Sequence, residues 1–257
     1  KRNCLKKNRK GRRQNMKAGK IIAGVIGVTG LASVIGLAIT GWKINWGPFR
    51  FLHTWENDIC RIEETYSTSE TDEIIFYGAS NFSLWDQLDE DLESYGYKVQ
   101  NHAFGGSTDE DLTEYADRIL YPYNPAVVVL QTGSNDYVHM SGTDEEKVEK
   151  CMEYKKEMYE TFHKNLPEAK IVIMSGLLLP GRSEYTQLTQ KINQALKDYA
   201  KTTDYLYFVD SEKMTFDGET YRDDLFRKDG IHLNHEGELL WCKDYIVPAL
   251  NELERNE

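Results

Sequence analysis

Cysteine is scarce in this sequence, and the four cysteines are widely scattered, at positions 4, 60, 151 and 242. No CxxC motif and no Cys/His cluster has the spacing of metal ligands, which argues against a structural zinc site. Cys151 and Cys242 lie within helical patterns, which favours packing in the core, with a disulfide as the open alternative.

The motifs of several common enzyme classes are also missing. No GxGxxG or Walker loop follows an apolar run, so the usual signals of dinucleotide and nucleoside triphosphate binding are absent. The GxSxG nucleophile motif is absent as well. No internal repeat or low-complexity linker interrupts the body of the chain, whose 257 residues suffice for one domain or two small ones.

Positive charge is scarce outside the first 20 residues. Residues 1–20 contain ten Lys or Arg and no acid, whereas the other 237 residues contain 21 basic and 42 acidic side chains. Such an acidic body repels the phosphates of nucleic acid, so no nucleic-acid partner is expected. The basic segment is better explained by the apolar run that follows it.

That apolar run extends over residues 21–39 without a charge, and Trp42 and Trp46 follow it. As a helix it would be about 28 Å long, close to the thickness of the hydrocarbon core of a bilayer. We therefore predict a basic cytoplasmic segment at 1–20, a transmembrane anchor at 21–41 and a juxtamembrane linker with a short helix at 42–70. Because positive charge precedes the run, the domain that follows is expected outside the cytoplasm.

The apolar run has two alternative interpretations. A buried core helix is disfavoured because no polar stripe interrupts the run. A cleaved signal peptide stays open because Gly36 and Ala38 form a small-x-small site, although the run is longer than a usual signal core.

Strand-length and helical patterns alternate five times in residues 71–257. Continuous apolar runs, typical of strands buried on both faces, occupy 74–79, 97–101, 126–133, 170–176 and 205–210. Helical patterns separate them, at Leu84 to Leu92, after a Ser107/Glu110 capping box, after Asp144, at 184–200 and at 236–253. The alternation predicts a doubly wound α/β domain with a parallel sheet and a site at the carboxyl ends of its strands.

Polar residues stand at those strand ends. Ser80 follows the first strand and opens a helix, where backbone N–H groups can stabilise an oxyanion, although a serine there is more often a simple helix cap. Asp229 and His232 lie three apart before the last helix. Histidine can take the proton of a serine, and a carboxylate can orient the histidine. His235 is a second candidate base, but it is wrongly spaced from Asp229.

Two further strand ends offer hydrogen-bond donors. Gly106 follows the second strand with an unobstructed backbone N–H, and Asn135 follows the third with a side-chain amide. Taken singly, the glycine is equally well a turn residue and the asparagine a helix cap. Together with the Ser80 N–H, the two donors suit an oxyanion that develops during reaction.

The segments GASN, FGGST, GSND and DGIH, in this order, resemble the four blocks of the SGNH hydrolases, or GDSL-like lipases and esterases. The family's Ser, Gly, Asn and His correspond to Ser80, Gly106, Asn135 and His232, and Asp229 matches its triad acid. The resemblance covers about residues 72–253 and implies a flavodoxin-like, five-stranded parallel sheet of order 2-1-3-4-5. One departure is Ala79, where the family usually has aspartate; since that aspartate is outside the triad, we expect it to tune the site.

These expectations combine into a membrane-anchored serine esterase that cleaves short-acyl esters, such as O-acetyl groups, on an extracytoplasmic saccharide or cell-wall substrate. The mechanism requires no metal or organic cofactor. An O-acyltransferase that passes the acyl group to a glycan hydroxyl is the first alternative, and a catalytically silent binding or scaffold protein is the second. The sequence leaves the acyl group and the oligomeric state open.

Overall fold

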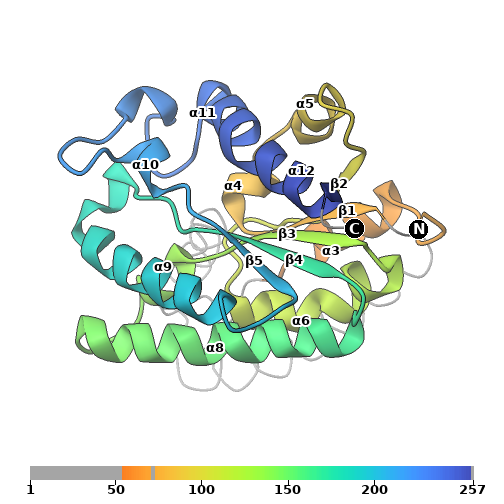
Figure 1. Ribbon diagram of the computed structural model, residues 1–257, viewed down its shortest axis with the longest axis horizontal. Coiled ribbons are helices and arrows are strands. Elements are labelled where there is room, and N and C mark those ends of the chain that lie inside the picture. Colours follow the sequence, from red (N-terminus) through yellow and green to blue (C-terminus); the bar gives the residue numbers. More distant parts are fainter. Residues whose placement is uncertain (1–53, 71–72, 256–257) are drawn as a thin grey trace, which may run out of the picture. The chain divides into compact units, whose positions relative to one another are not determined.

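A computed structural model describes residues 54–70 and 73–255 (Figure 1). The predicted cytoplasmic segment and anchor at 1–41 lie outside these residues, as do 42–53 of the linker. None of the helices within the described ranges is long and apolar enough to span a bilayer. The chain divides into two compact units, Lys1–Thr65 and Tyr66–Glu257.

In the first unit, the described residues form helix α3, Glu56–Thr65. Trp55, Ile59 and Ile62 are buried, as their helical spacing predicts. The short helix expected within 42–70 is therefore present.

The second unit is built on five parallel strands in the order β2-β1-β3-β4-β5. The strands are β1 (Ile74–Gly78), β2 (Val99–Asn101), β3 (Val127–Gln131), β4 (Lys170–Met174) and β5 (Leu206–Val209). Each falls within one of the five predicted apolar runs. The strand order that the family resemblance implied is confirmed.

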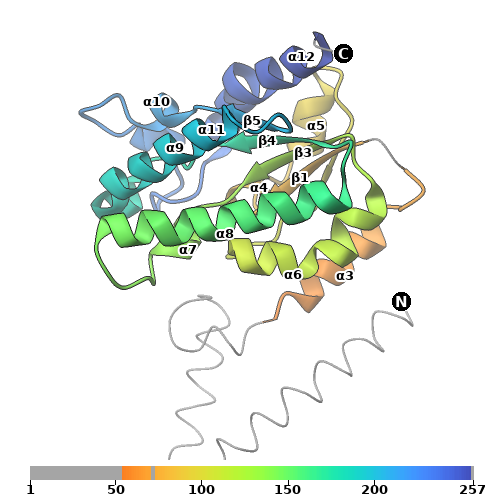
Figure 2. The same cartoon turned by 60° about the horizontal axis from the view of Figure 1, so that its bottom comes forward.

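Helices cover both faces of the sheet (Figures 1 and 2). One face carries α6 (Asp109–Ile119), α8 (Asp144–Asn165) and α9 (Thr186–Ala200). The other carries α4 (Ser80–Ser83), α5 (Leu88–Glu93), α11 (His235–Trp241) and α12 (Val247–Arg255). The remaining short helices are α7 (Ser134–Tyr137), α10 (Glu212–Thr215), η2 (Tyr121–Tyr123), η3 (Pro180–Tyr185), η4 (Asp223–Leu225) and the π-helical turn η5 (Cys242–Ile246).

Aromatic side chains fill the core on the α4/α11 face. Phe82 lies between Phe76 of β1 and Trp241 of α11, with ring centroids 5.0 and 5.4 Å away, and all three are fully buried. Cys151 and Cys242 are free thiols with no exposed surface, which confirms that they pack in the core. This packing fixes the short helix that begins at Ser80.

Three helix predictions need correction. The pattern from Leu84 to Leu92 is helical only from Leu88, where α5 begins, because Leu84 lies in the break between α4 and α5 and is 36% exposed. The capping box of α6 is formed by Thr108 and Asp111, because the Ser107 hydroxyl donates to the Gly78 carbonyl of β1 instead. The predicted helix at 236–253 is α11 and α12, joined by a π-helical turn.

Candidate active site

The loops after β1, β2 and β3 meet at the carboxyl edge of the sheet, since β1 lies between β2 and β3. The carbonyl of Gly78, at the end of β1, accepts hydrogen bonds from Phe104 N (3.0 Å) and Ser107 Oγ (3.3 Å) of the loop after β2. The carbonyl of Gln131, at the end of β3, accepts from Ala79 N at 3.2 Å. These bonds hold together the loops that carry Ser80, Gly106 and Asn135.

Ser80 is positioned by a sharp turn from β1 into α4. Gly78 has a φ of +152°, and a Cβ there would come within 2.1 Å of the Gln131 carbonyl oxygen, so glycine is required at this close approach. Ala79 is the N-cap of α4, and Ser80 is its first residue, half-buried. The backbone N–H of Ser80 therefore belongs to the first turn of a helix, where no intrahelical acceptor exists for it.

A continuous chain of hydrogen bonds joins Ser80, His232 and Asp229. His232 Nε2 lies 2.9 Å from Ser80 Oγ, and His232 Nδ1 lies 2.8 Å from Asp229 Oδ2. When Nδ1–H donates to the carboxylate, Nε2 is left as the acceptor for the serine hydroxyl. This is the arrangement in which a histidine can remove the serine proton.

Hydrogen bonds hold Asp229 in its ionised form. Its Oδ1 accepts from the backbone N–H groups of Ile231 (2.8 Å) and His232 (3.0 Å). Partial burial alone would raise the pKa of Asp229, but these N–H groups and the His232 ring lower it to about 2. The carboxylate is therefore charged across the physiological range and can stabilise an imidazolium.

The loop that carries His232 is fixed to the helix that carries Ser80. Asn81 Oδ1, adjacent to Ser80, accepts from Leu233 N at 3.2 Å. Arg227 bridges the same two segments, since its Nε donates to the Leu233 carbonyl (2.9 Å) and its Nη2 donates to the carbonyl of Leu84 (2.8 Å). The separation of the serine and histidine thus depends on residues flanking both.

A second close approach fixes the Asp229 turn from the other side. Gly181 N donates to the Gly230 carbonyl at 2.8 Å. A Cβ on Gly181 would lie 2.3 Å from the Asp229 carbonyl oxygen, and Gly230 has a φ of +65°. Two glycines therefore let the loop after β4 pack directly against the turn that presents Asp229 and His232.

The predicted oxyanion donors lie on the loops after β2 and β3. Gly106 is half-buried with a φ of +78°, and Gly105 beside it is close to Ser80, because a Cβ on Gly105 would be 3.8 Å from that of Ser80. Asn135 lies in the first turn of α7, and its Nδ2 donates to the Ser107 carbonyl at 3.1 Å. An amide nitrogen carries two hydrogens, so the second N–H of Asn135 is available for a substrate oxygen.

His235, the second candidate base, does not face the serine. Its Nδ1 lies 3.4 Å from Glu238 Oε2 and 3.8 Å from Asp91 Oδ2. Burial raises the pKa of Glu238, while His235 and Arg227 oppose that rise. His235 thus lies beside acidic side chains of α5 and α11.

Sequence reasoning missed two buried polar residues at this edge, Asn81 and Arg182. Arg182, 8% exposed, donates through Nη1 to the Ser134 hydroxyl, next to Asn135. Burial lowers the pKa of its guanidinium. The position of Asn81 beside the serine was the one sequence signal for it; nothing in the sequence singled out Arg182.

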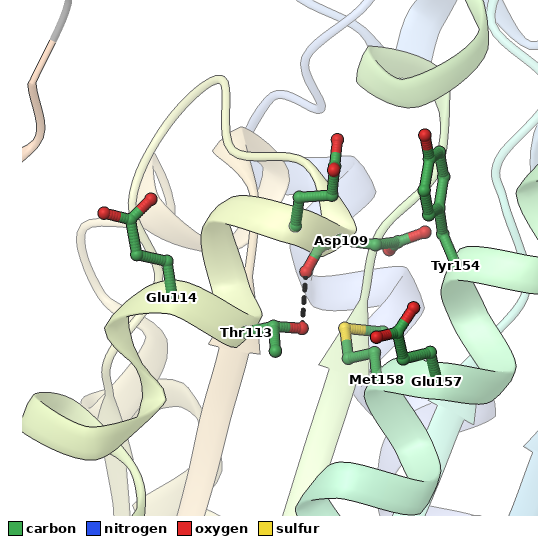
Figure 3. A pocket seen from close by; sticks show the side chains of 7 residues that line it. Asp109, Thr113, Glu114, Tyr154, Glu157 and Met158 are labelled. Carbon is green, nitrogen blue, oxygen red and sulfur yellow. Dashed lines mark hydrogen bonds between the residues drawn. The ribbon is translucent and has the colours of Figure 1, made fainter.

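A cavity of about 280 Å³ lies elsewhere, between α6 and α8, and none of the predicted site residues lines it (Figure 3). Four of the residues that line it are acidic, Asp109, Glu110, Glu114 and Glu157. In the described part of the chain, no group of three or more His, Cys, Asp or Glu side chains is arranged to hold a metal ion.

The sequence matches the model of the GDSL-like lipase/acylhydrolase family over residues 69–240. These limits enclose every residue of the hydrogen-bonded chain and both predicted oxyanion donors. No curated protein matches the chain.

Several solved structures are similar to it. A lipase/acylhydrolase from Enterococcus faecalis is 20% identical, with 72% of this chain and 97% of that chain covered and a TM-score of 0.56. A family 3 carbohydrate esterase from Clostridium thermocellum is 17% identical (71% and 98% covered, TM-score 0.54). A variant acetyl-xylooligosaccharide esterase from Geobacillus is also 17% identical (70% and 92% covered, TM-score 0.54). At these identities the similarity shows a shared fold.

Proposed function

We propose that this chain, which belongs to the GDSL-like lipase/acylhydrolase family, is a serine esterase with Ser80, His232 and Asp229 as its catalytic triad. The observation that carries the proposal is the unbroken chain of hydrogen bonds from Asp229 through His232 to Ser80. Ser80 lies 152 residues before His232 in the sequence, and a surface loop of ordinary polar residues would not need to meet it in this way.

In the first half of the reaction, His232 Nε2 takes the proton of Ser80 as Oγ attacks the acyl carbonyl. The carbonyl oxygen becomes an oxyanion, which accepts hydrogen bonds from the backbone N–H of Ser80 and Gly106 and from the Asn135 amide. When the intermediate collapses, the bond to the leaving alcohol breaks and the imidazolium returns its proton to that alcohol.

The second half repeats these steps with water. His232 takes a proton from water as its oxygen attacks the acyl-enzyme, and the proton then passes to Ser80 Oγ as the carboxylic acid leaves. Asp229 keeps the ring in the required tautomer and stays ionised throughout, consistent with its pKa of about 2.

The substrate we favour is a short-acyl ester, such as an O-acetyl group, on a saccharide. The site is open, since the His232 and Asp229 side chains are 24% and 45% exposed, which leaves room for a bulky leaving group. Two of the similar structures are of a carbohydrate esterase and an acetyl-xylooligosaccharide esterase, which supports the same substrate class. The uncharged run at 21–39 supports a location at the membrane, with the domain outside the cytoplasm.

The same open site favours one second candidate, an O-acyltransferase. If a glycan hydroxyl replaces water in the second half, the acyl group moves to that hydroxyl with the same triad. Competition between water and an oligosaccharide acceptor would distinguish the two activities, because transfer lowers the yield of free acid without lowering consumption of the donor.

The test is hydrolysis of p-nitrophenyl acetate by the chain and by its Ser80→Ala variant. We expect the variant to lose at least a thousandfold in kcat, since the nucleophile is removed. Ser83→Ala, in the same short helix, is the matched control and should stay within about threefold of the parent. If Ser80→Ala retains the parental rate, the proposed triad is wrong; if the folded parent has no activity, the silent-scaffold alternative replaces it.

A further inference from the structure

A lysine is buried in the interior, on the sheet-facing side of α8. Lys155 is 1% exposed, and its Nζ lies 3.0 and 3.2 Å from the two carboxylate oxygens of Asp109, which is also 1% exposed. The same ammonium donates to Thr132 Oγ1 at 2.6 Å. Burying a charged pair is costly, and an ordinary apolar side chain would fill this position in a helix that served only for packing.

The partners of Lys155 belong to the two loops that carry the oxyanion donors. Asp109 lies three residues after Gly106, at the start of α6, and Thr132 lies three residues before Asn135, just after β3. Lys155 is therefore a bridge between the loop after β2 and the loop after β3, and it touches neither donor.

Two more hydrogen bonds join the same loops. Asp109 N donates to Asp136 Oδ1 at 3.0 Å, and Asn135 Nδ2 donates to the Ser107 carbonyl at 3.1 Å. Asp136 and Ser107 are both buried. The Lys155 ammonium is thus part of a buried polar network that extends to the Asn135 amide and to the loop that contains Gly106.

The network keeps Lys155 charged. Burial alone would lower the pKa of Lys155, but the carboxylate of Asp109, with a smaller contribution from Asp136, raises it. Asp109 also lines the acidic cavity between α6 and α8, where its backbone carbonyl accepts from Thr113 Oγ1 at 2.8 Å (Figure 3). Its backbone is therefore held from the α6 side while its carboxylate is held by Lys155.

We propose that Lys155 is a positioning residue for the oxyanion-binding donors, which it aligns by tying Asp109 to Thr132 beneath the site. The inference rests on the proposed esterase function. Donors stabilise an oxyanion only if they are rigidly placed, because an error of about 1 Å sacrifices much of the gain. Removal of the ammonium frees the two loops to shift relative to each other, while Ser80, His232 and Asp229 keep their direct contacts.

The experiment compares the full chain with Lys155→Met after its active sites have been counted by complete fluorophosphonate labelling. For p-nitrophenyl acetate, we expect kcat per labelled site to fall roughly 10- to 100-fold, less than for loss of a donor, with KM within about threefold. Affinity for an alkyl boronic acid, whose serine adduct is tetrahedral and anionic, should fall by the same factor as kcat. A purely structural role would lower the number of labelled sites but leave kcat per labelled site and the boronic acid affinity unchanged.

Two further variants keep the test decisive. Phe162→Leu alters another fully buried residue of α8, which packs against the rings of Tyr77 and Tyr121, and should keep parental kcat per site. Lys155→Met combined with Asp109→Asn removes both charges and avoids an uncompensated buried carboxylate. This double variant should fold and remain 10- to 100-fold slow, because the bridge to Thr132 is still absent.

If the double variant had the kcat per site and the boronic acid affinity of the parent, the inference would be overturned, since Lys155 would then only neutralise Asp109. The same values in Lys155→Met as in Phe162→Leu would also overturn it. A folded parent chain that neither hydrolyses nor labels would instead overturn the proposed function, which is a separate result.

Discussion

The carboxylate of Asp229 stays ionised although it is partly buried, which by itself would raise its pKa. Two backbone N–H groups and the His232 ring are sufficient, because hydrogen bonds to the charged form of a carboxyl lower its pKa. The hydrogen bonds that keep Asp229 ionised and orient the His232 ring therefore all lie within residues 229–232.

The same hydrogen bonds predict how stability depends on pH. The pKa of Asp229 in the folded chain is about 2, below its ordinary value of 3.8, so its ionised form contributes stability above about pH 4. That contribution disappears as pH falls from about 4 to 2. The difference in urea midpoint between the parent and Asp229→Asn should therefore shrink over this window. A difference that is constant from pH 6 to pH 2 would show that the carboxylate is not held in this way.

Asn135 offers a test of the oxyanion site at the level of one side chain. Asn135→Ala should lower kcat by roughly 10²–10³-fold with little change in KM, because the amide acts on charge that develops only in the transition state. Steady-state kinetics with p-nitrophenyl acetate measure this. Asn165→Ala is the matched control, since Asn165 is an exposed asparagine at the end of α8. Near-normal activity of Asn135→Ala would remove the amide from this role.

Sequence patterns predicted the candidate site residues but not the buried ion pair beneath them. Ser80 and His232 could be predicted as candidates because Ser80 directly follows an apolar run and His232 lies three residues after Asp229. Lys155 was overlooked although it lies three residues from both Met152 and Met158, on the inward face of α8. A lysine among inward positions is a signal of a buried ion pair, but its partner, Asp109, is 46 residues away and is brought near only by the fold.

At the scale of elements, the active site depends on how closely loops approach one another. Gly181→Ala would place a Cβ 2.3 Å from the Asp229 carbonyl oxygen and displace the turn that carries His232. We expect kcat to fall at least tenfold in a chain that still folds, since even small misplacement of a catalytic group is costly. Steady-state kinetics measure kcat, and circular dichroism shows whether the variant folds. Ser183→Ala, in the same η3 turn, is the control, and equal activity of both variants would exclude this packing constraint.

The strands and the long helices could be predicted because their apolar periodicity is strong. α8 begins at Asp144 as expected, after a capping box of Thr143 and Glu146. The predicted helix boundaries were wrong where contacts with other segments compete with the helical pattern. Ser107 bonds to the Gly78 carbonyl and does not cap α6, and α5 begins only at Leu88 although the apolar pattern starts at Leu84. These helix boundaries depend on contacts between distant segments, which the apolar periodicity of one segment cannot reveal.

At the scale of the whole molecule, the acidic body should influence which polymers reach the site. Residues 21–257 contain twice as many acidic as basic side chains. Hydrolysis of an acetylated anionic polysaccharide should therefore speed up when salt is raised from about 10 to 150 mM, because screening weakens the repulsion. Hydrolysis of a neutral acetylated xylooligosaccharide should change little. Equal salt dependence of the two hydrolysis rates would show that the negative charge of residues 21–257 does not affect how substrates reach the site.

The most direct test of the account is to find where a fluorophosphonate attaches. The reagent forms a stable covalent bond with an activated serine, and peptide mass spectrometry then identifies the labelled residue. We predict a single adduct on Ser80, whose hydroxyl lies 2.9 Å from His232 Nε2, and a large loss of labelling rate in His232→Ala. An adduct on another residue, or none on a folded chain, would contradict the proposed triad.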